Sequence, residues 1–106
     1  MSSATNRPLQ LTAPQLSTLA LLRDGWRCEL AGAQCPHVRK LLWYPFQRNG
    51  QHRAIAGSTI LGLIRRELAG WERTTVTMAY DGSEVAGYRL TLTAAGHQAC
   101  PKEEQL

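Results

Sequence analysis

Residues 58–70 have the sequence STILGLIRRELAG, which carries the periodicity of an amphipathic helix. Ser58 is a favourable N-cap residue, and Gly70 is predicted to end the helix. Apolar side chains recur at intervals of three and four residues, which places them on one face: Ile60, Leu61, Ile64 and Leu68. The opposite face carries Thr59, Gly62, Arg65 and Arg66. A glycine inside a helix costs up to about 1 kcal/mol relative to alanine, so we expect Gly62 to leave room for another backbone.

A first helix is predicted upstream, in the segment LTAPQLSTLALLRDG at residues 11–25. Thr12 and Gln15 have the spacing of a capping box, and Pro14 lies in the first turn, where its missing N–H costs little. Gly25 is predicted to end this helix. The expected core-facing stripe consists of Leu16, Leu19, Ala20 and Leu22.

A β-hairpin and a short helix are predicted downstream of residue 70. Apolar and polar residues alternate before and after a turn at residues 81–83 (Asp-Gly-Ser), which is the pattern of two antiparallel strands. Thr93 then has the position of an N-cap for a helix that ends near Cys100, before Pro101.

Residues 26–57, between the two main helices, follow no single pattern. Trp26, Cys28 and Leu30 alternate with charged residues, as in a strand. Residues 36–44 leave two interpretations open. Helical spacing is shown by Val38, Leu41 and Leu42. A hairpin is favoured by the aromatic residues Trp43, Tyr44 and Phe46 and by the Asn-Gly pair at residues 49–50. We predict a strand from Lys40 to Phe46, the turn, and an extended return to Ala56.

The composition indicates one small globular domain. The chain has 106 residues, of which 43% are hydrophobic and 19% charged, so it is too apolar for a disordered protein. No apolar run approaches the ~20 residues that span a bilayer, and the polar N-terminus lacks a signal-peptide pattern. Three cysteines suit a reducing cytoplasm. We expect flexible ends at residues 1–8 and 101–106.

The segments at residues 11–25, 58–70 and 87–99 (GYRLTLTAAGHQA) together resemble a winged helix-turn-helix domain. The resemblance covers residues 9–100, and it implies an α+β fold in which the middle helix is the recognition helix. An extended insert at 26–57 stands where the family has a short second helix, and a C-terminal β-hairpin wing is expected at 71–92. The chain is also similar in size and composition to small phage proteins, including anti-CRISPR proteins, which implies an inhibitor in the cytoplasm of a bacterial host.

Positive charge is concentrated in the middle of the chain. Residues 30–66 carry six basic and no acidic residues, a net charge of +6, whereas residues 1–29 carry +1 and residues 67–106 carry −3. A long block without a carboxylate predicts a surface that binds a polyanion. The alternative is a basic surface that serves only solubility.

Aromatic and basic residues are interleaved within this block. Exposed aromatic rings together with cations bind single-stranded nucleic acid, because unpaired bases stack on the rings at about 1–3 kcal/mol each. The predicted nucleic-acid-binding residues are Arg39, Lys40, Trp43, Tyr44, Arg48, Arg53, Arg65 and Arg66. In the alternative interpretation, Trp43 and Phe46 belong to the core and Tyr44 points outward. The wing tip carries Asp81 and Glu84, which argues against its insertion into a DNA groove.

The sequence contains no nucleotide-binding, zinc-protease or hydrolase motif, so we predict no enzymatic activity and no cofactor. Four residues have the chemistry of zinc ligands: Cys28, Cys35, His37 and His52. Structural zinc sites usually separate paired ligands by two to four intervening residues, whereas one residue separates Cys35 from His37 and the other candidates are farther apart. We therefore predict no metal site, although the spacing leaves zinc as an alternative.

The leading hypothesis is a non-enzymatic DNA-binding protein that blocks its target by steric occlusion. Single strands are favoured over duplex, and the displaced strand of an R-loop is a natural target. A CRISPR effector complex as partner is implied only by the resemblance. The alternatives are a transcription regulator that binds duplex DNA as a dimer and an inhibitor that binds a protein subunit.

Overall fold

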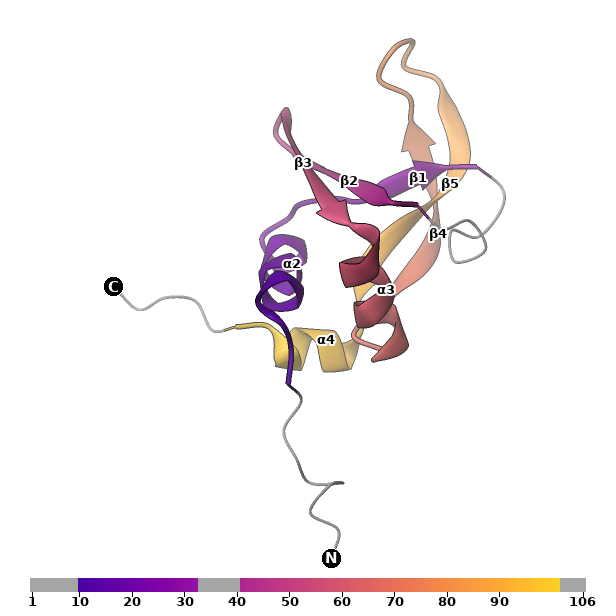
Figure 1. Cartoon of the computed structure of the whole chain (residues 1–106). Helices are drawn as coiled ribbons and strands as arrows, with labels where there is room; N and C mark the ends of the chain where they lie inside the picture. The colour runs from indigo at the N-terminus through magenta and orange to yellow at the C-terminus, as the bar shows by residue number, and fades with distance from the viewer. Residues whose placement is uncertain (1–9, 33–40, 102–106) are drawn as a thin grey trace, which may run out of the picture.

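A computed structural model describes residues 10–32 and 41–101, and it has the expected α+β class (Figure 1). The predictions for residues 1–8 and 102–106 lie outside the described residues. In chain order, the elements are α2 (Ala13–Arg23), β1 (Glu29–Ala31), β2 (Trp43–Arg48), β3 (Gln51–Ala56), α3 (Gly57–Arg65), β4 (Ala69–Thr77), β5 (Glu84–Leu92) and α4 (Ala94–Ala99).

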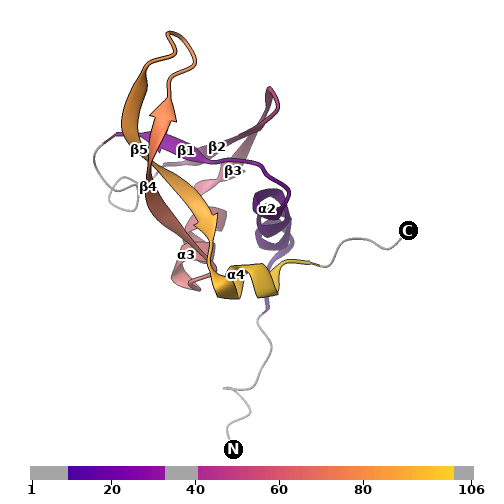
Figure 2. The ribbon, with the colours of Figure 1, turned by 180° about the vertical axis from the view of Figure 1, so that it is seen from behind.

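The strands form two antiparallel sheets, which are visible from opposite sides in Figures 1 and 2. One sheet has the order β1-β5-β4, and the other is the β2–β3 hairpin. Arg27 connects the two, because its N–H donates to the Gln47 carbonyl (2.8 Å) and its carbonyl accepts from the Gln47 N–H (2.9 Å). Two residues later the same chain segment enters β1, where Glu29 pairs with Arg89. Residues 26–31 therefore hold the hairpin against the larger sheet.

Helix α2 begins as predicted. The Thr12 N–H donates to Gln15 Oε1 (2.9 Å), and the Gln15 N–H donates to Thr12 Oγ1 (3.2 Å), which completes the capping box. Gly25, with φ of 94°, follows the C-cap residue Asp24. The predicted stripe was partly wrong, because Leu21 is buried while Leu16, Ala20 and Leu22 are only half-buried. The most buried face of α2 consists of Gln15, Thr18, Leu19 and Leu21.

Helix α3 differs from its prediction at both ends. It begins at Gly57 without a side-chain cap, because β3 runs directly into it and the Gly57 N–H donates to the Leu42 carbonyl (2.7 Å). It ends at Arg65, and the left-handed Glu67 (φ 59°) turns the chain into β4. Gly70 therefore lies in a strand instead of closing the helix.

The surroundings of Gly62 also differ from expectation. A Cβ atom at this position would lie 2.6 Å from Nε2 of Gln15. The space beside Gly62 is therefore occupied by a side chain of α2 and not by another backbone. Gly62 allows the two helices to pack closely at this point.

The predicted hairpin and last helix are confirmed. β4 and β5 pair from Ala69↔Leu92 to Thr77↔Glu84, slightly beyond the predicted wing. In the turn, Asp81 Oδ1 accepts from the Ser83 N–H (3.0 Å) and hydroxyl (2.8 Å). Thr93 caps α4 through the Gly96 N–H (3.0 Å).

The core lies between the two sheets and the helices. Its fully buried large side chains come from α2, both sheets, α3 and the α3–β4 turn: Leu19, Tyr44, Phe46, Ile60, Leu63, Leu68 and Leu90. Trp26, Cys28 and Leu30 point into it, as their alternation predicted. The strand prediction for residues 40–46 is confirmed from Trp43 onward and the helical alternative is wrong at residues 43–44, whereas residues 36–40 lie outside the described residues.

Candidate nucleic-acid interface

The β2–β3 hairpin sorts the aromatic and basic residues of the insert onto two faces. Its two-residue turn consists of Asn49 (φ 50°) and Gly50 (φ 81°), which matches the predicted turn. Side chains alternate along each strand, so every second residue faces the core. The inner face comprises Tyr44, Phe46, Arg48, Arg53 and Ile55, and the outer face comprises Trp43, Pro45, Gln47, His52 and Ala54.

Tyr44 was predicted as a contact residue, and the structure corrects this. Its side chain is 1% exposed, and its ring centroid lies 5.8 Å from that of Trp71. Tyr44 is thus part of the core and offers no surface for a base. The alternative is confirmed for Phe46, which is fully buried, and wrong for Trp43 and for an outward Tyr44. Residues three apart in a strand point to opposite faces, so Trp43 and Phe46 cannot both face the core.

Trp43 is the exposed aromatic residue of the hairpin. It is 57% exposed and follows Leu42, which is 81% exposed. Beside Trp43, the outer face has a shallow pocket of about 380 Å³ that is lined mainly by Pro45, His52 and Ala54. An exposed indole next to a small apolar depression is a surface on which a planar ring can stack.

Arg48 and Arg53 are brought together by Trp26. The guanidinium carbons lie 5.1 Å (Arg48) and 5.8 Å (Arg53) from the centroid of the Trp26 ring, so both make cation–π contacts. Arg48 also donates from Nη1 to the Asp24 carbonyl (3.0 Å), whereas its buried Nε has no acceptor among the described residues. The Arg48 guanidinium is therefore largely engaged in contacts within the protein, whereas Arg53 is exposed to solvent.

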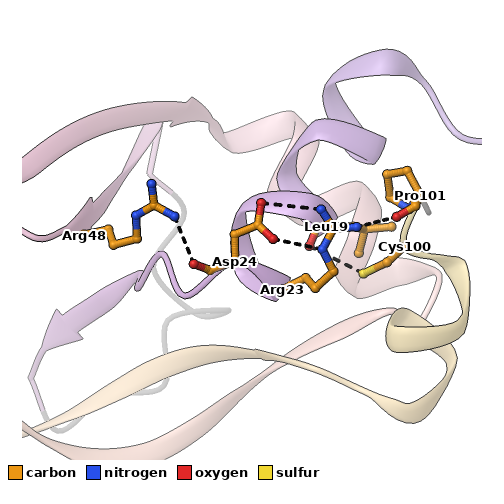
Figure 3. A network of polar contacts seen from close by, with 6 residues as sticks. All are labelled: Leu19, Arg23, Asp24, Arg48, Cys100 and Pro101. Atoms are coloured by element: carbon orange, nitrogen blue, oxygen red, sulfur yellow. Dashed lines mark hydrogen bonds and ion pairs between the residues drawn. The ribbon is translucent and has the colours of Figure 1, made fainter. Parts of the chain in front are cut away.

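Polar contacts at the end of α2 hold the hairpin in place (Figure 3). Arg23 pairs with the Asp24 carboxylate (2.9 Å) and donates to the Pro101 carbonyl, and the Cys100 thiol donates to the Leu19 carbonyl (3.5 Å). The hydrogen bond from Arg23 lowers the pKa of Asp24. Together with the Arg48 contact, this network joins the end of α2 to α4 and to β2.

The remaining predicted cations are not part of this cluster. Arg65 and Arg66 are exposed at the end of α3. The helix continues from β3, so they lie at the opposite end of this unit from the hairpin turn (Figure 1). Arg39 and Lys40 lie outside the described residues. The described residues therefore divide the predicted basic surface into two separate groups.

Arg27 was not predicted as a contact residue, but the structure places it beside the outer face of the hairpin. It is exposed and forms a β-bridge with Gln47. Directly paired residues of antiparallel strands point to the same side, so Arg27 lies beside the outer face. Its outward position was implied by the alternation with Trp26 and Cys28. None of the outer-face residues is acidic.

The candidate zinc ligands are only partly described. Cys28 is fully buried in the core, whereas His52 is exposed on the outer face, so these two side chains do not converge. Cys35 and His37 lie outside the described residues. No cluster of three or more His, Cys, Asp or Glu residues suited to a metal ion occurs in residues 10–32 and 41–101.

Burial gives Cys28 a measurable effect on stability. Desolvation raises the pKa of its thiol to about 12, whereas an unfolded cysteine ionises near 8.5. Above pH 9 the unfolded chain therefore loses a proton that the folded chain keeps, and we expect stability to fall by about 1.4 kcal/mol per pH unit from this group. Urea denaturation at pH 8, 9 and 10 measures the slope. The Cys28→Ala variant should show a shallower decline, and equal slopes would contradict this assignment.

No protein-family model, curated protein sequence or solved structure matches the chain. No helix in the described part of the chain is long and apolar enough to cross a membrane.

Proposed function

We propose that the protein is a non-enzymatic nucleic-acid-binding protein that uses the outer face of the β2–β3 hairpin and favours single strands. The observation that carries this proposal is the 57% exposure of Trp43 on a face that has no carboxylate and has Arg27 and Arg53 beside it. A tryptophan is usually largely buried, so its exposure in a structured strand requires a reason. Stacking of an unpaired base would cover it.

The cations around Trp43 support binding of a phosphate backbone. Arg27 lies beside the outer face, and Arg53 lines the rim of the Trp43 pocket. Residues 30–66 carry no acidic residue, so repulsion from neighbouring carboxylates is small. A cationic surface with an aromatic platform is the arrangement that proteins use for single strands.

Single strands fit this surface better than duplex DNA. The bases of a duplex are already stacked on one another and leave no free ring face for Trp43. The wing tip carries Asp81 and Glu84, whose charges oppose contact with phosphates.

A duplex-binding regulator is the second candidate. The exposed Arg65 and Arg66 at the end of α3 favour it, because the sequence resemblance to winged helix-turn-helix proteins implies that this helix is the recognition helix. The order of the elements along the chain (helix, extended insert, helix, hairpin) supports the same resemblance.

Occlusion is the proposed mode of action. A small protein bound along an exposed strand excludes other proteins from it without turnover. The R-loop of a CRISPR effector complex offers such a strand. An anti-CRISPR role in a bacterial cytoplasm rests on the sequence resemblance alone.

The decisive experiment compares two exposed aromatic residues. Fluorescence anisotropy measures the affinity for matched single-stranded and duplex oligonucleotides at low and high salt. Trp43→Ala should weaken single-strand binding by about 5- to 150-fold, the loss of one stacked base. Tyr80→Ala is the matched control, because Tyr80 is 81% exposed but lies beside the acidic wing tip. Its affinity should remain unchanged.

The same experiment separates the candidates. Preference for one duplex sequence, lost in Arg65→Ala/Arg66→Ala and retained in Trp43→Ala, would establish the regulator instead. Equal loss in Trp43→Ala and Tyr80→Ala would exclude the outer face as the site. Absence of binding to either form would exclude both nucleic-acid functions and favour a protein target.

A further inference from the structure

The hydrogen-bonding pattern of β2 determines which backbone groups of β3 are free. Both backbone groups of Gln47 bond to Arg27, so they point away from β3. In an antiparallel pair these directions alternate, so the residues of β2 that bond to β3 are Tyr44, Phe46 and Arg48. The bond from the Gly57 N–H to the Leu42 carbonyl (2.7 Å) continues the same alternation.

The free groups of β3 therefore belong to His52 and Ala54. The register pairs Phe46 with Arg53, so the Arg53 backbone is used within the hairpin. His52 and Ala54, on either side of it, direct an N–H and a carbonyl away from β2. In the described part of the chain β3 pairs with β2 alone, and both residues are exposed.

A groove of about 330 Å³ runs between this edge and α2. Its walls include Pro14, Ser17 and Leu21 from the helix and Arg53, Ala54 and Ala56 from the strand. The small side chains of Ser17, Ala54 and Ala56 leave space for another backbone. Exposed strand edges are commonly protected by lysine, proline or a bulge, and the free positions here are a histidine and an alanine.

We propose that the β3 edge binds an extended, acidic segment of a partner protein as an additional antiparallel or parallel strand. The added strand lies in the groove beside α2, and its backbone bonds to His52 and Ala54. Charge selects the partner, because Arg53 lines the groove and neither α2 nor residues 30–66 contain an acidic residue. The edge uses the backbone of His52 and Ala54, whose side chains also line the Trp43 pocket. A peptide bound through these backbone groups does not require that the outer face bind nucleic acid.

A peptide fits the edge better than a nucleic acid does. The edge alternates donors with acceptors, and a peptide backbone supplies both. A phosphate backbone supplies only acceptors, so the carbonyls of His52 and Ala54 would be left without donors. The chemistry of the edge therefore favours a polypeptide.

Amide hydrogen exchange of the full chain tests the proposal directly. The probe is an acetylated and amidated octapeptide of alternating glutamate and valine, and its control has lysine in place of glutamate. At a probe concentration ten times the Kd, exchange at His52 and Ala54 should slow by about tenfold. The Arg53 amide should change little, because it is already bonded within the hairpin. The lysine peptide should produce no protection.

Two substitutions at one position add a matched comparison. Ala54→Pro removes an N–H that the β2–β3 pairing does not use, so the fold should tolerate it, and peptide affinity should fall by about tenfold. Ala54→Ser keeps the N–H and should bind like the wild type. Circular dichroism verifies that both variants are folded.

Three results would overturn the proposal. The first is unchanged exchange at His52 and Ala54 with the glutamate peptide at millimolar concentration. The second is equal binding of the lysine peptide. The third is protection of the two amides in the free protein that rises with protein concentration, which would show that a second copy of the chain occupies the edge.

Discussion

Replacing Phe46 with alanine is expected to lower the free energy of unfolding by about 3–5 kcal/mol. Phe46 is fully buried in the core, where it is one of the largest side chains. Its removal loses the transfer free energy of the ring and leaves a cavity that the surrounding core side chains fill only partly. Because small domains are stable by about 5–15 kcal/mol, this single change approaches the limit for folding.

Urea denaturation followed by far-UV circular dichroism measures this effect. Gln47→Ala is the matched control, since Gln47 is the next residue of β2 and is exposed on the outer face. Its free energy of unfolding should stay within about 0.5 kcal/mol of the wild type. Similar losses in both variants would contradict the assignment of inner and outer faces. That assignment also determines that Trp43 is available to a ligand.

Gly96→Ala is expected to lower the free energy of unfolding by about 3 kcal/mol. A Cβ atom at Gly96 would lie 1.9 Å from the Leu68 carbonyl oxygen and 3.2 Å from a methyl carbon of Leu92. The backbone oxygen cannot move without displacing the β4–β5 sheet, since the Thr93 N–H donates to it (3.1 Å). Helix propensity alone predicts the opposite sign, because alanine is favoured over glycine by about 1 kcal/mol inside a helix.

Gly70→Ala is the control for this prediction. Gly70 lies in β4, and a Cβ atom there would meet no atom within 4 Å. The substitution should be neutral or stabilising by up to about 1 kcal/mol, because alanine loses less backbone entropy on folding. Thermal and urea denaturation of the two variants give the comparison. A stabilised Gly96→Ala variant would show that α4 does not pack against Leu68.

Local signals in the sequence predicted most of the secondary structure. The Thr12 capping box, the Asn-Gly turn at residues 49–50 and the Thr93 N-cap each act through hydrogen bonds or backbone angles within a few residues. The alternation of Trp26, Cys28 and Leu30 predicted which side of their segment is buried. These features depend on neighbours along the chain, so they require no knowledge of the rest of the fold.

The end of α3 and the direction of Tyr44 were not predictable in this way. Gly70 was a plausible helix end, but a left-handed Glu67 ends α3 earlier, where Leu68 enters the core. Tyr44 and Trp43 are adjacent aromatic residues, and either one suits a strand. Burial of Tyr44 depends on Trp71, which lies on a strand far along the chain.

The cations of the candidate site also have one property that the sequence predicts and one that only the fold determines. Their number and the absence of carboxylates between residues 30 and 66 follow from composition and predict affinity for a polyanion. Their position depends on contacts distant in sequence: Trp26 gathers Arg48 and Arg53, and the direct passage of β3 into α3 carries Arg65 away from them. Net charge is a sum over residues and does not depend on how the chain folds, whereas a binding surface exists only where packing brings separate segments together.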